Sequence, residues 1–157
     1  MGREAFLKRL KKGHDLQLDV GRRFLEDGFI VTVHPYQEYG SDEYDILVKP
    51  SDKAKWREIE VKGNGKFFND VDDFPYNSVF VETVKRRDGR ETPPVYYVIV
   101  SYKTGAALCI HNSTHPHWSS IRTKDTQKDL YDDFLTCPKE LCETWDEMIG
   151  RLRGIVR

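Results

Sequence analysis

Polar and apolar residues alternate in WREIEVKG, residues 56–63, in the way expected of a strand with one buried face. Ile59 and Val61 would face the core, whereas Glu60 and Lys62 would share the opposite face with a second carboxylate two residues earlier. A half-solvated strand explains this alternation by itself. The charged residues therefore gain chemical meaning only if other groups converge on them.

Apolar residues recur at helical spacing from Arg3 to Asp27, and Gly13 with His14 predicts a break between two helical pieces. Gly28 is expected to end the second piece. Runs rich in apolar and β-branched residues predict strands at residues 29–34, 44–48, 56–62, 78–84, 95–102 and 106–110. The first strand would be stopped by Pro35, and the polar stretch 36–43 would form a loop.

Connections between these strands predict how they pair. The short turn at residues 50–55 favours a hairpin of the second and third strands, and the DG pair in KRRDGR, residues 85–90, favours a hairpin tip. Residues 63–77 show no periodic pattern, which predicts a long loop of the kind that is often functional or mobile. VYYVIVSY, residues 95–102, is apolar on both faces and predicts a central strand covered on both sides.

Beyond a loop at residues 111–118, the pattern predicts helices at about 124–134 and 138–152. The order of elements therefore predicts an α/β fold with a mixed sheet of five or six strands flanked by helices. The 157 residues suit one domain, with a core at about 16–110 and C-terminal helices at about 124–153.

Composition narrows the class of protein. Twenty-five Lys and Arg balance 26 Asp and Glu, so the net charge of −1 is not that of a generally basic nucleic-acid binder, and any such surface must be a local patch. Cys109, Cys137 and Cys142 lack paired spacing, which favours small buried side chains in a reducing compartment. The charged N-terminus predicts neither a signal peptide nor a membrane helix, so we expect a cytoplasmic protein without a membrane partner.

Asp45 stands out because its neighbours in YDILV are apolar or aromatic, and a buried carboxylate without a partner is costly. A hairpin of the second and third strands would bring Asp45 to Glu60, with Lys62 on the same face. Two carboxylates and a backbone carbonyl, such as that of Val61, are oxygen ligands that suit Mg²⁺. Mg²⁺ would lower the pKa of a bound water that Lys62 could orient, a chemistry that fits hydrolysis of a phosphodiester.

Asp45 in SDEYDILV and the triplet EVK at Glu60 to Lys62 resemble the signature of the PD-(D/E)XK nuclease superfamily, and the element order from about Leu16 to Ile110 is similar. That superfamily has a restriction-endonuclease-like fold and includes Holliday junction resolvases and phage nucleases. The resemblance implies a Mg²⁺-dependent DNA endonuclease, with Mn²⁺ as an alternative metal. It also implies that Asp45 and Glu60 are metal ligands and that Lys62 is the catalytic lysine.

The resemblance extends to supporting residues. Glu82 in NSVFVE falls where phage members carry an acidic residue, and Gln17, with Asp19 nearby, stands where resolvase-like members carry a first-helix Glu. DNA is the implied partner, in recombination or repair, in a bacterium or a phage-infected host. Many relatives cut as dimers, so a homodimer is an expectation, and no small-molecule cofactor is implied. Cutting would be structure-directed or non-specific, because no separate sequence-reading domain is visible.

Basic residues near this motif are candidates for contact with a phosphate backbone, although a solvated hairpin tip explains them about equally well. The candidates are Lys85, Arg86, Arg87, Arg90, Lys66 and Lys103. His111, His115 and His117 lack the paired spacing of zinc motifs, so a solvated loop is favoured over a phosphate contact. Two other functions stay open: a catalytically idle nucleic-acid or protein-binding module of the same fold, and an RNA-processing nuclease.

Overall fold

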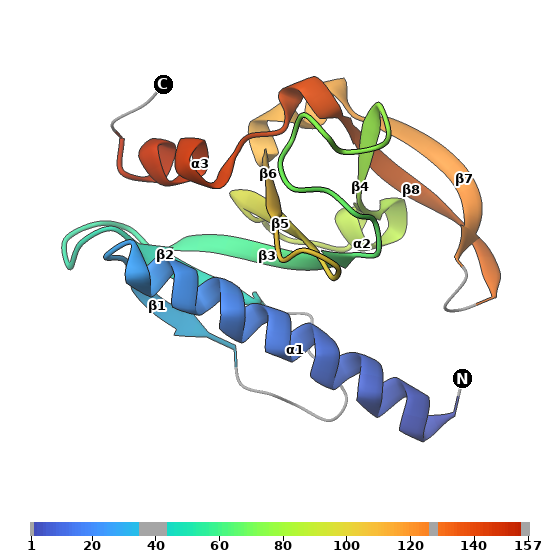
Figure 1. The fold of residues 1–157 in the computed structure, drawn as a ribbon, viewed down its shortest axis with the longest axis horizontal. Helices are drawn as coiled ribbons and strands as arrows, with labels where there is room; N and C mark the ends of the chain where they lie inside the picture. The colour runs from blue at the N-terminus through green and yellow to red at the C-terminus, as the bar shows by residue number, and fades with distance from the viewer. Residues whose placement is uncertain (1, 35–43, 126–128, 155–157) are drawn as a thin grey trace.

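One long helix, α1 (Arg3–Glu26), lies across the larger of two sheets in the computed structural model, which describes residues 2–34, 44–125 and 129–154 (Figure 1). The predicted break at Gly13 and His14 is wrong. A single glycine in a helix costs only about 1 kcal/mol relative to alanine, and burial of Val20 and Phe24 one turn apart anchors the helix on the sheet. The predicted strand stop and loop at residues 35–43 lie outside the described residues.

Gly28 ends α1 as predicted. Its φ of 86° is a left-handed conformation, and its N–H donates to the Leu25 carbonyl at 2.9 Å. The next N–H, of Phe29, donates to the Phe24 carbonyl at 3.0 Å, which completes a Schellman motif. The chain is thereby turned directly into the first strand, beside the helix it has just left.

The larger sheet has five strands in the order β1-β2-β3-β5-β6. Their bounds are β1 (Ile30–Val33), β2 (Ile46–Lys49), β3 (Arg57–Asn64), β5 (Tyr96–Ser101) and β6 (Ala107–His111). The predicted hairpin is confirmed, because β2 and β3 pair antiparallel with Ile46 opposite Ile59. The sheet is mixed, since β3 and β5 run parallel while the other neighbours are antiparallel. The protein is therefore α/β with a mixed five-stranded sheet, as the element order predicts.

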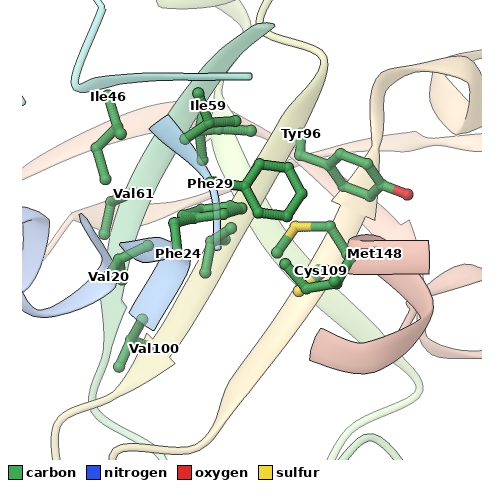
Figure 2. Close-up of a cluster of buried hydrophobic side chains, with 13 residues drawn as sticks. Val20, Phe24, Phe29, Ile46, Ile59, Val61, Tyr96, Val100, Cys109 and Met148 are labelled. Atoms are coloured by element: carbon green, nitrogen blue, oxygen red, sulfur yellow. The ribbon is translucent and has the colours of Figure 1, made fainter. Parts of the chain in front are cut away.

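The strand β5 is buried at all six positions, which confirms the prediction that it is covered on both sides, although β3 and not β5 is the middle strand of the sheet. Tyr96 and Val98 face a core shared with Phe24 of α1 and Met148 near the C-terminus (Figure 2). Tyr97 and its neighbours on the opposite face belong to a second core beneath the smaller sheet. Two cores therefore cover β5 from both sides, and Ile59 and Val61 anchor the neighbouring strand β3 in the first core.

The smaller sheet overturns two predictions. It has three antiparallel strands in the order β4-β8-β7: β4 (Ser78–Thr83), β8 (Leu130–Pro138) and β7 (Ser119–Asp125). The strand predicted at residues 78–84 thus belongs to a second sheet, and the helix predicted at 124–134 is a hairpin instead. Charged side chains on both faces hide the two-residue period there, and Asp129, with φ of 55°, forms part of the turn.

KRRDGR does not form a hairpin tip, because β4 and β5 lie in different sheets and the link between them crosses over. It folds instead as the short helix α2 (Val84–Asp88). The Thr83 hydroxyl accepts a hydrogen bond from the Arg86 N–H at 3.1 Å, which is a helix N-cap. The basic side chains of this segment consequently point in several directions around a helical turn.

The C-terminal helix is shorter than predicted. Cys142 and Glu143 follow the turn η2 (Lys139–Leu141), and reciprocal hydrogen bonds of 2.9 and 2.7 Å join Glu143 to Cys109 of β6, so α3 begins only at Trp145 and runs to Leu152. The predicted loop at residues 111–118 contains a 3-10 helix, η1 (Asn112–His117). The loop predicted at 63–77 is confirmed from Gly65 to Asn77.

All three cysteines are free and buried, which confirms the prediction that their side chains are buried. Phe68 and Phe74 are buried in the second core, so the long loop that carries them is pinned at two points. Within the part of the chain that the structure describes, no helix combines the length and apolar character needed to cross a membrane.

Thr144→Ala is expected to lower the free energy of unfolding by about 1 kcal/mol. The Thr144 hydroxyl caps α3 by accepting from the Glu147 N–H at 3.2 Å, and the Glu147 carboxylate accepts from the Thr144 N–H at 3.2 Å. Thr144→Ser keeps the acceptor and is the matched control. Urea titrations of both variants measure the effect, and equal loss in the two would contradict the capping role.

Candidate functional site

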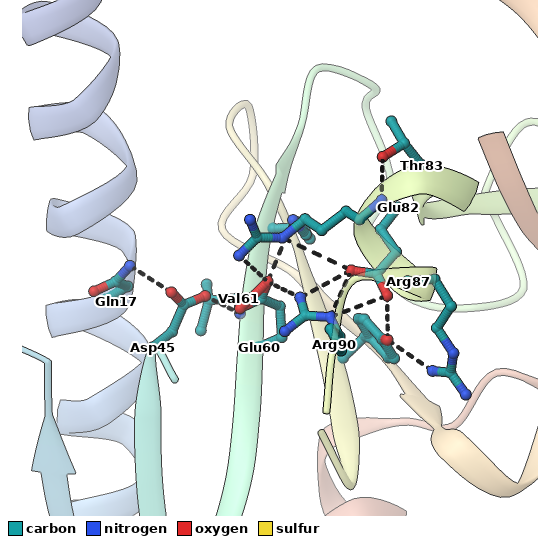
Figure 3. A network of polar contacts seen from close by, with 11 residues as sticks. Gln17, Asp45, Glu60, Val61, Glu82, Thr83, Arg87 and Arg90 are labelled. Atoms are coloured by element: carbon teal, nitrogen blue, oxygen red, sulfur yellow. Dashed lines mark hydrogen bonds and ion pairs between the residues drawn. The ribbon is translucent and has the colours of Figure 1, made fainter. Parts of the chain in front are cut away.

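Asp45 lies immediately before β2, and both of its carboxyl oxygens are held in place (Figure 3). The Val61 backbone N–H donates to Oδ2 at 2.8 Å, and Gln17 Nε2, from α1, donates to Oδ1 at 2.9 Å. The antiparallel pairing of β2 with β3 brings Asp45 to this position. Three elements therefore meet at one carboxyl group that the sequence singles out.

Glu60 projects from the opposite face of β3 to Ile59 and Val61, as the alternation predicts, but it is only 2% exposed. Three cations surround its Oε2 atom: Lys62 Nζ at 3.4 Å, Arg86 Nη2 at 3.4 Å and Arg90 Nη2 at 2.5 Å. Its other oxygen, Oε1, is buried and receives no hydrogen bond from a donor within the described residues. Glu60 is thus surrounded by positive charge, and one of its carboxylate oxygens lacks a hydrogen-bond donor.

Glu82 extends the network on the other side of Arg90. Arg90 Nη2 lies 2.8 Å from Glu82 Oε1, and the Tyr97 hydroxyl donates to Glu82 Oε2 at 2.5 Å (Figure 3). The pairing of β4 with β8 shifts between Phe80 and Glu82, and such a bulge re-aims a side chain. Phe80 is consequently exposed while Glu82 points inward. Arg90 bridges two buried carboxylates and is itself only 8% exposed.

Asp45 and Glu60 shift each other's pKa in opposite directions. Burial, the negative charge of Glu60 and a hydrogen bond shared with Glu60 raise the pKa of Asp45 to about 8. Burial also acts to raise the pKa of Glu60, but Lys62, the hydrogen bond from Asp45 and Arg90 together lower it to about 2. Asp45 is therefore the member of the pair that holds a proton more readily.

These residues fit a divalent metal with hard oxygen ligands. The carboxyl groups of Asp45 and Glu60 lie close enough to shift each other's pKa, and Glu60 has a buried oxygen that no donor among the described residues satisfies, which is the kind of donor set that Mg²⁺ prefers. Among the residues that the structure describes, no cluster of three or more His, Cys, Asp or Glu side chains could hold an ion. Asp45 and Glu60 would therefore supply the protein carboxylates, with a carbonyl such as that of Val61, and water or substrate would complete the shell.

The remaining candidates divide between this network and other places. Asp19 forms ion pairs with Arg22 and Arg23 on α1, at 2.7 and 2.8 Å. Arg87 donates to the Tyr97 hydroxyl at 2.9 Å and lies over the Trp118 ring. Neither Asp19 nor Arg87 contacts Asp45 or Glu60 in any recorded interaction.

A groove of about 1590 Å³ opens beside the network, between the end of β3 and the smaller sheet. Lys62, Lys66, Lys85 and Arg86 line it. Lys103 is exposed but does not line the groove, and Arg90, which does, is held by two carboxylates and offers little surface to a ligand. The basic candidates that face the same space as Lys62 are therefore Lys66, Lys85 and Arg86.

The chain was compared with protein-family models, curated proteins and solved structures. No protein-family model, curated protein or solved structure matches the chain. A function must therefore be inferred from the geometry of Asp45, Glu60, Lys62 and their partners.

Sequence reasoning missed the part that Arg90 and Tyr97 play in ordering the site. From the sequence, Arg90 is either a DNA contact or part of a solvated turn, and Tyr97 is one residue of the apolar stretch 95–102. One signal was available: Glu82 lies in an apolar strand and needs a cation or a donor, and a buried tyrosine hydroxyl needs an acceptor. That Arg90 also reaches Glu60 depends on the crossover through α2, which local sequence does not reveal.

Asp45→Asn is expected to stabilise the metal-free protein increasingly as pH rises from 6 to 9. The pKa of Asp45 is about 8 when folded, against 3.8 for an ordinary carboxyl group, so the folded state alone keeps a proton between these values. Stability conferred by that proton is lost as pH rises through the folded pKa, by up to about 1.4 kcal/mol per pH unit. The lowered pKa of Glu60 acts only below its ordinary value of 4.5, outside this range.

Urea unfolding in EDTA at pH 6, 7, 8 and 9 measures this effect. The free energy of unfolding of Asp45→Asn minus that of the wild type should increase by at least about 1 kcal/mol between pH 6 and pH 9. Asp19→Asn is the control, because Asp19 is ion-paired on the helix surface and has a lowered pKa. Parallel curves for wild type and Asp45→Asn would contradict the raised pKa.

Proposed function

We propose that the protein is a Mg²⁺-dependent DNA endonuclease with a restriction-endonuclease-like core of the PD-(D/E)XK type. The observation that carries the proposal is that Asp45, held by the Val61 N–H at 2.8 Å, stands beside the strand that carries the buried Glu60, with Lys62 Nζ 3.4 Å from Glu60. Buried like charges of this kind destabilise a fold unless a cation or a proton offsets them. A site that keeps them together is typical of metal-assisted chemistry.

The arrangement of elements supports the same proposal. A helix, an antiparallel run of β1, β2 and β3, and a parallel partner β5 place Asp45 and the EVK triplet at the middle of a mixed sheet. This order resembles the superfamily's core, in which the Asp-bearing strand and the (D/E)-x-K strand are neighbours. The smaller sheet and α3 are then additions around that core.

In the proposed reaction, bound Mg²⁺ would supply positive charge at the scissile phosphate and lower the pKa of a water molecule. Asp45 is oriented for this role by the Val61 N–H and by Gln17. Arg90 and Arg86 hold Glu60 through its Oε2 atom, which leaves Oε1 without a hydrogen-bond donor among the described residues. The Lys62 ammonium, half-buried at the groove, would orient the attacking water or stabilise negative charge developing on the phosphate.

DNA is the proposed partner because Lys66, Lys85 and Arg86 line the same groove as Lys62 and can contact phosphates on either side of the scissile bond. Mn²⁺ should replace Mg²⁺, since both accept hard oxygen ligands. We place the activity in the cytoplasm of a bacterium or of a phage-infected host, and a homodimer would allow both strands of a duplex to be cut.

One gel tests this function. Supercoiled plasmid, circular single-stranded DNA and a four-way junction are each incubated with the protein in Mg²⁺ or in EDTA. Cleavage of a closed circle in Mg²⁺ alone, absent from Asp45→Asn, is the expected result. No cleavage of any substrate in Mg²⁺ or Mn²⁺ would refute an endonuclease, and equal cleavage in EDTA would refute metal dependence.

The two arginines on Glu60 favour a second candidate, a catalytically idle module that binds nucleic acid or protein. Arg90 and Arg86 already neutralise Glu60, so no metal is required to stabilise its charge. Such a module would bind Mn²⁺ no better as wild type than as Asp45→Asn. The nuclease site predicts binding that the substitution removes.

A further inference from the structure

The two arginines at Glu60 are held there unequally. Arg90 Nη2 lies 2.5 Å from Glu60 Oε2, and the Arg90 side chain is 8% exposed (Figure 3). The same nitrogen lies 2.8 Å from Glu82 Oε1, so Arg90 is tied to two carboxylates at short distance. Arg86 lies farther from both, with Nη2 3.4 Å from Glu60 Oε2 and Nε 3.9 Å from Glu82 Oε1, and its side chain is 34% exposed. Arg86 is therefore the more weakly held of the two arginines.

Arg86 connects the buried Glu60 with the groove. Glu60 is not part of the lining of the groove, whereas Arg86 and Lys62 both line it. Arg86 Nη2 and Lys62 Nζ each lie 3.4 Å from the same atom, Glu60 Oε2, and the Lys62 side chain is 31% exposed. These two cations are thus within reach of both Glu60 and an anion in the groove.

The cations that hold Glu60 also oppose a divalent metal at this carboxylate. Each of them repels a metal ion there, and because Glu60 is buried, water and salt screen the repulsion only weakly. Arg90 contributes less to the repulsion, since the negative charge of Glu82 lies 2.8 Å away and offsets it. Arg86 is farther from Glu82, so more of its positive charge acts on a metal at Glu60. Departure of Arg86 would therefore favour metal binding.

We propose that Arg86 weakens metal binding at Glu60 and leaves this carboxylate for an oxyanion in the groove, so that the metal and the oxyanion bind cooperatively. The inference rests on the proposed function, in which the oxyanion is a phosphate of the substrate. A guanidinium group suits the exchange, because its planar fork binds carboxylate and phosphate oxygens alike. The coupling is reciprocal: an anion that draws Arg86 from Glu60 raises the affinity for the metal, and the metal raises the affinity for the anion by the same factor.

Calorimetric titration with Mn²⁺ at pH 8.5 tests this coupling, with sulfate as the oxyanion and chloride of equal ionic strength as the comparison. Wild type should bind Mn²⁺ at least about fivefold more tightly in sulfate than in chloride. Arg86→Gln should bind Mn²⁺ at least about fivefold more tightly than wild type in chloride, because the competing charge is gone, and sulfate should change its Kd less than about twofold. Arg87→Gln removes an equal charge from the next residue of α2, which contacts Tyr97 instead of Glu60. Its Kd should stay within about twofold of wild type in each salt.

Three results would overturn the inference: equal Mn²⁺ affinity of the wild type in the two salts, an unchanged or weaker Mn²⁺ affinity of Arg86→Gln in chloride, or the same gain in Arg87→Gln as in Arg86→Gln. The last would identify a general effect of charge on α2. Failure of the proposed function looks different. Coupled binding of Mn²⁺ and sulfate without cleavage of any DNA would remove the nuclease and keep the role of Arg86, whereas Mg²⁺-dependent cleavage with equal Mn²⁺ affinity in both salts would do the reverse. Absence of Mn²⁺ binding from wild type and Arg86→Gln in both salts would refute the metal site and this inference together.

Discussion

Lys62→Ala should lower the rate of Mg²⁺-dependent DNA cleavage by at least about 100-fold while leaving the fold intact. Removal of a positioned proton-transfer group or of a charge that stabilises the transition state typically costs a factor of this size or more. Among the described residues, Lys62 is the only lysine whose amine forms an ion pair with Glu60, and it lines the groove. Single-turnover cleavage of supercoiled plasmid measures the loss.

Lys66→Ala is the matched control for Lys62→Ala. Lys66 lines the same groove but lies over the Tyr76 ring at 5.4 Å and forms no recorded ion pair with Glu60. Its loss should weaken DNA binding modestly and leave the rate at saturating DNA within about threefold. Cleavage by Lys62→Ala at a rate close to that of the wild type, with an unchanged melting temperature, would rule out a catalytic role for this lysine.

Arg90→Ala is expected to cost about 3–5 kcal/mol of folding free energy, because removal of one partner from a buried ion pair leaves uncompensated charge. Arg90 Nη2 lies 2.5 Å from Glu60 and 2.8 Å from Glu82, and both carboxylates are buried. Its truncation would leave Glu60 with only the longer contacts to Lys62 and Arg86. Chemical denaturation at neutral pH measures the change.

An exposed ion pair provides the comparison for Arg90. Arg122 lies 3.3 Å from Asp133, and their side chains are 64 and 49% exposed. Arg122→Ala should therefore change stability by no more than about 1 kcal/mol. If Arg90→Ala lowered stability as little as Arg122→Ala, this result would contradict the claim that Arg90 compensates the buried charges of Glu60 and Glu82.

Periodicity in the sequence predicts the larger sheet because its strands follow simple rules. Ile59 and Val61 alternate with charged residues on β3, β5 is apolar throughout, and Gly28 marks the end of α1. Asp45 could be paired with Glu60 from sequence because a short turn makes β2 and β3 a hairpin. These features depend on neighbours close in the chain, where patterns are informative.

The smaller sheet could not be predicted in the same way. Asp132 and Asp133 of β8, together with the exposed Leu130 and Tyr131, give no alternation of buried and exposed positions, and the segment reads as helical. The strand also pairs with β4, from Ser78 opposite Pro138 to Thr83 opposite Phe134, and such long-range pairing overrides local preference. For the same reason, the ion pairs of Arg90 with Glu60 and Glu82 could not be predicted from the sequence.

The proposed site depends on the Asp45–Glu60 pair binding a divalent ion, and calorimetric titration of the protein with Mn²⁺ at pH 8.5 tests this most directly. The chosen pH lies above the raised pKa of Asp45, so the proton that competes with the metal is largely gone. Wild type should bind Mn²⁺, and Asp45→Asn and Glu60→Gln should each lose the binding while keeping the wild-type circular dichroism spectrum. Equal Mn²⁺ binding by all three proteins, or none by the wild type, would contradict the site.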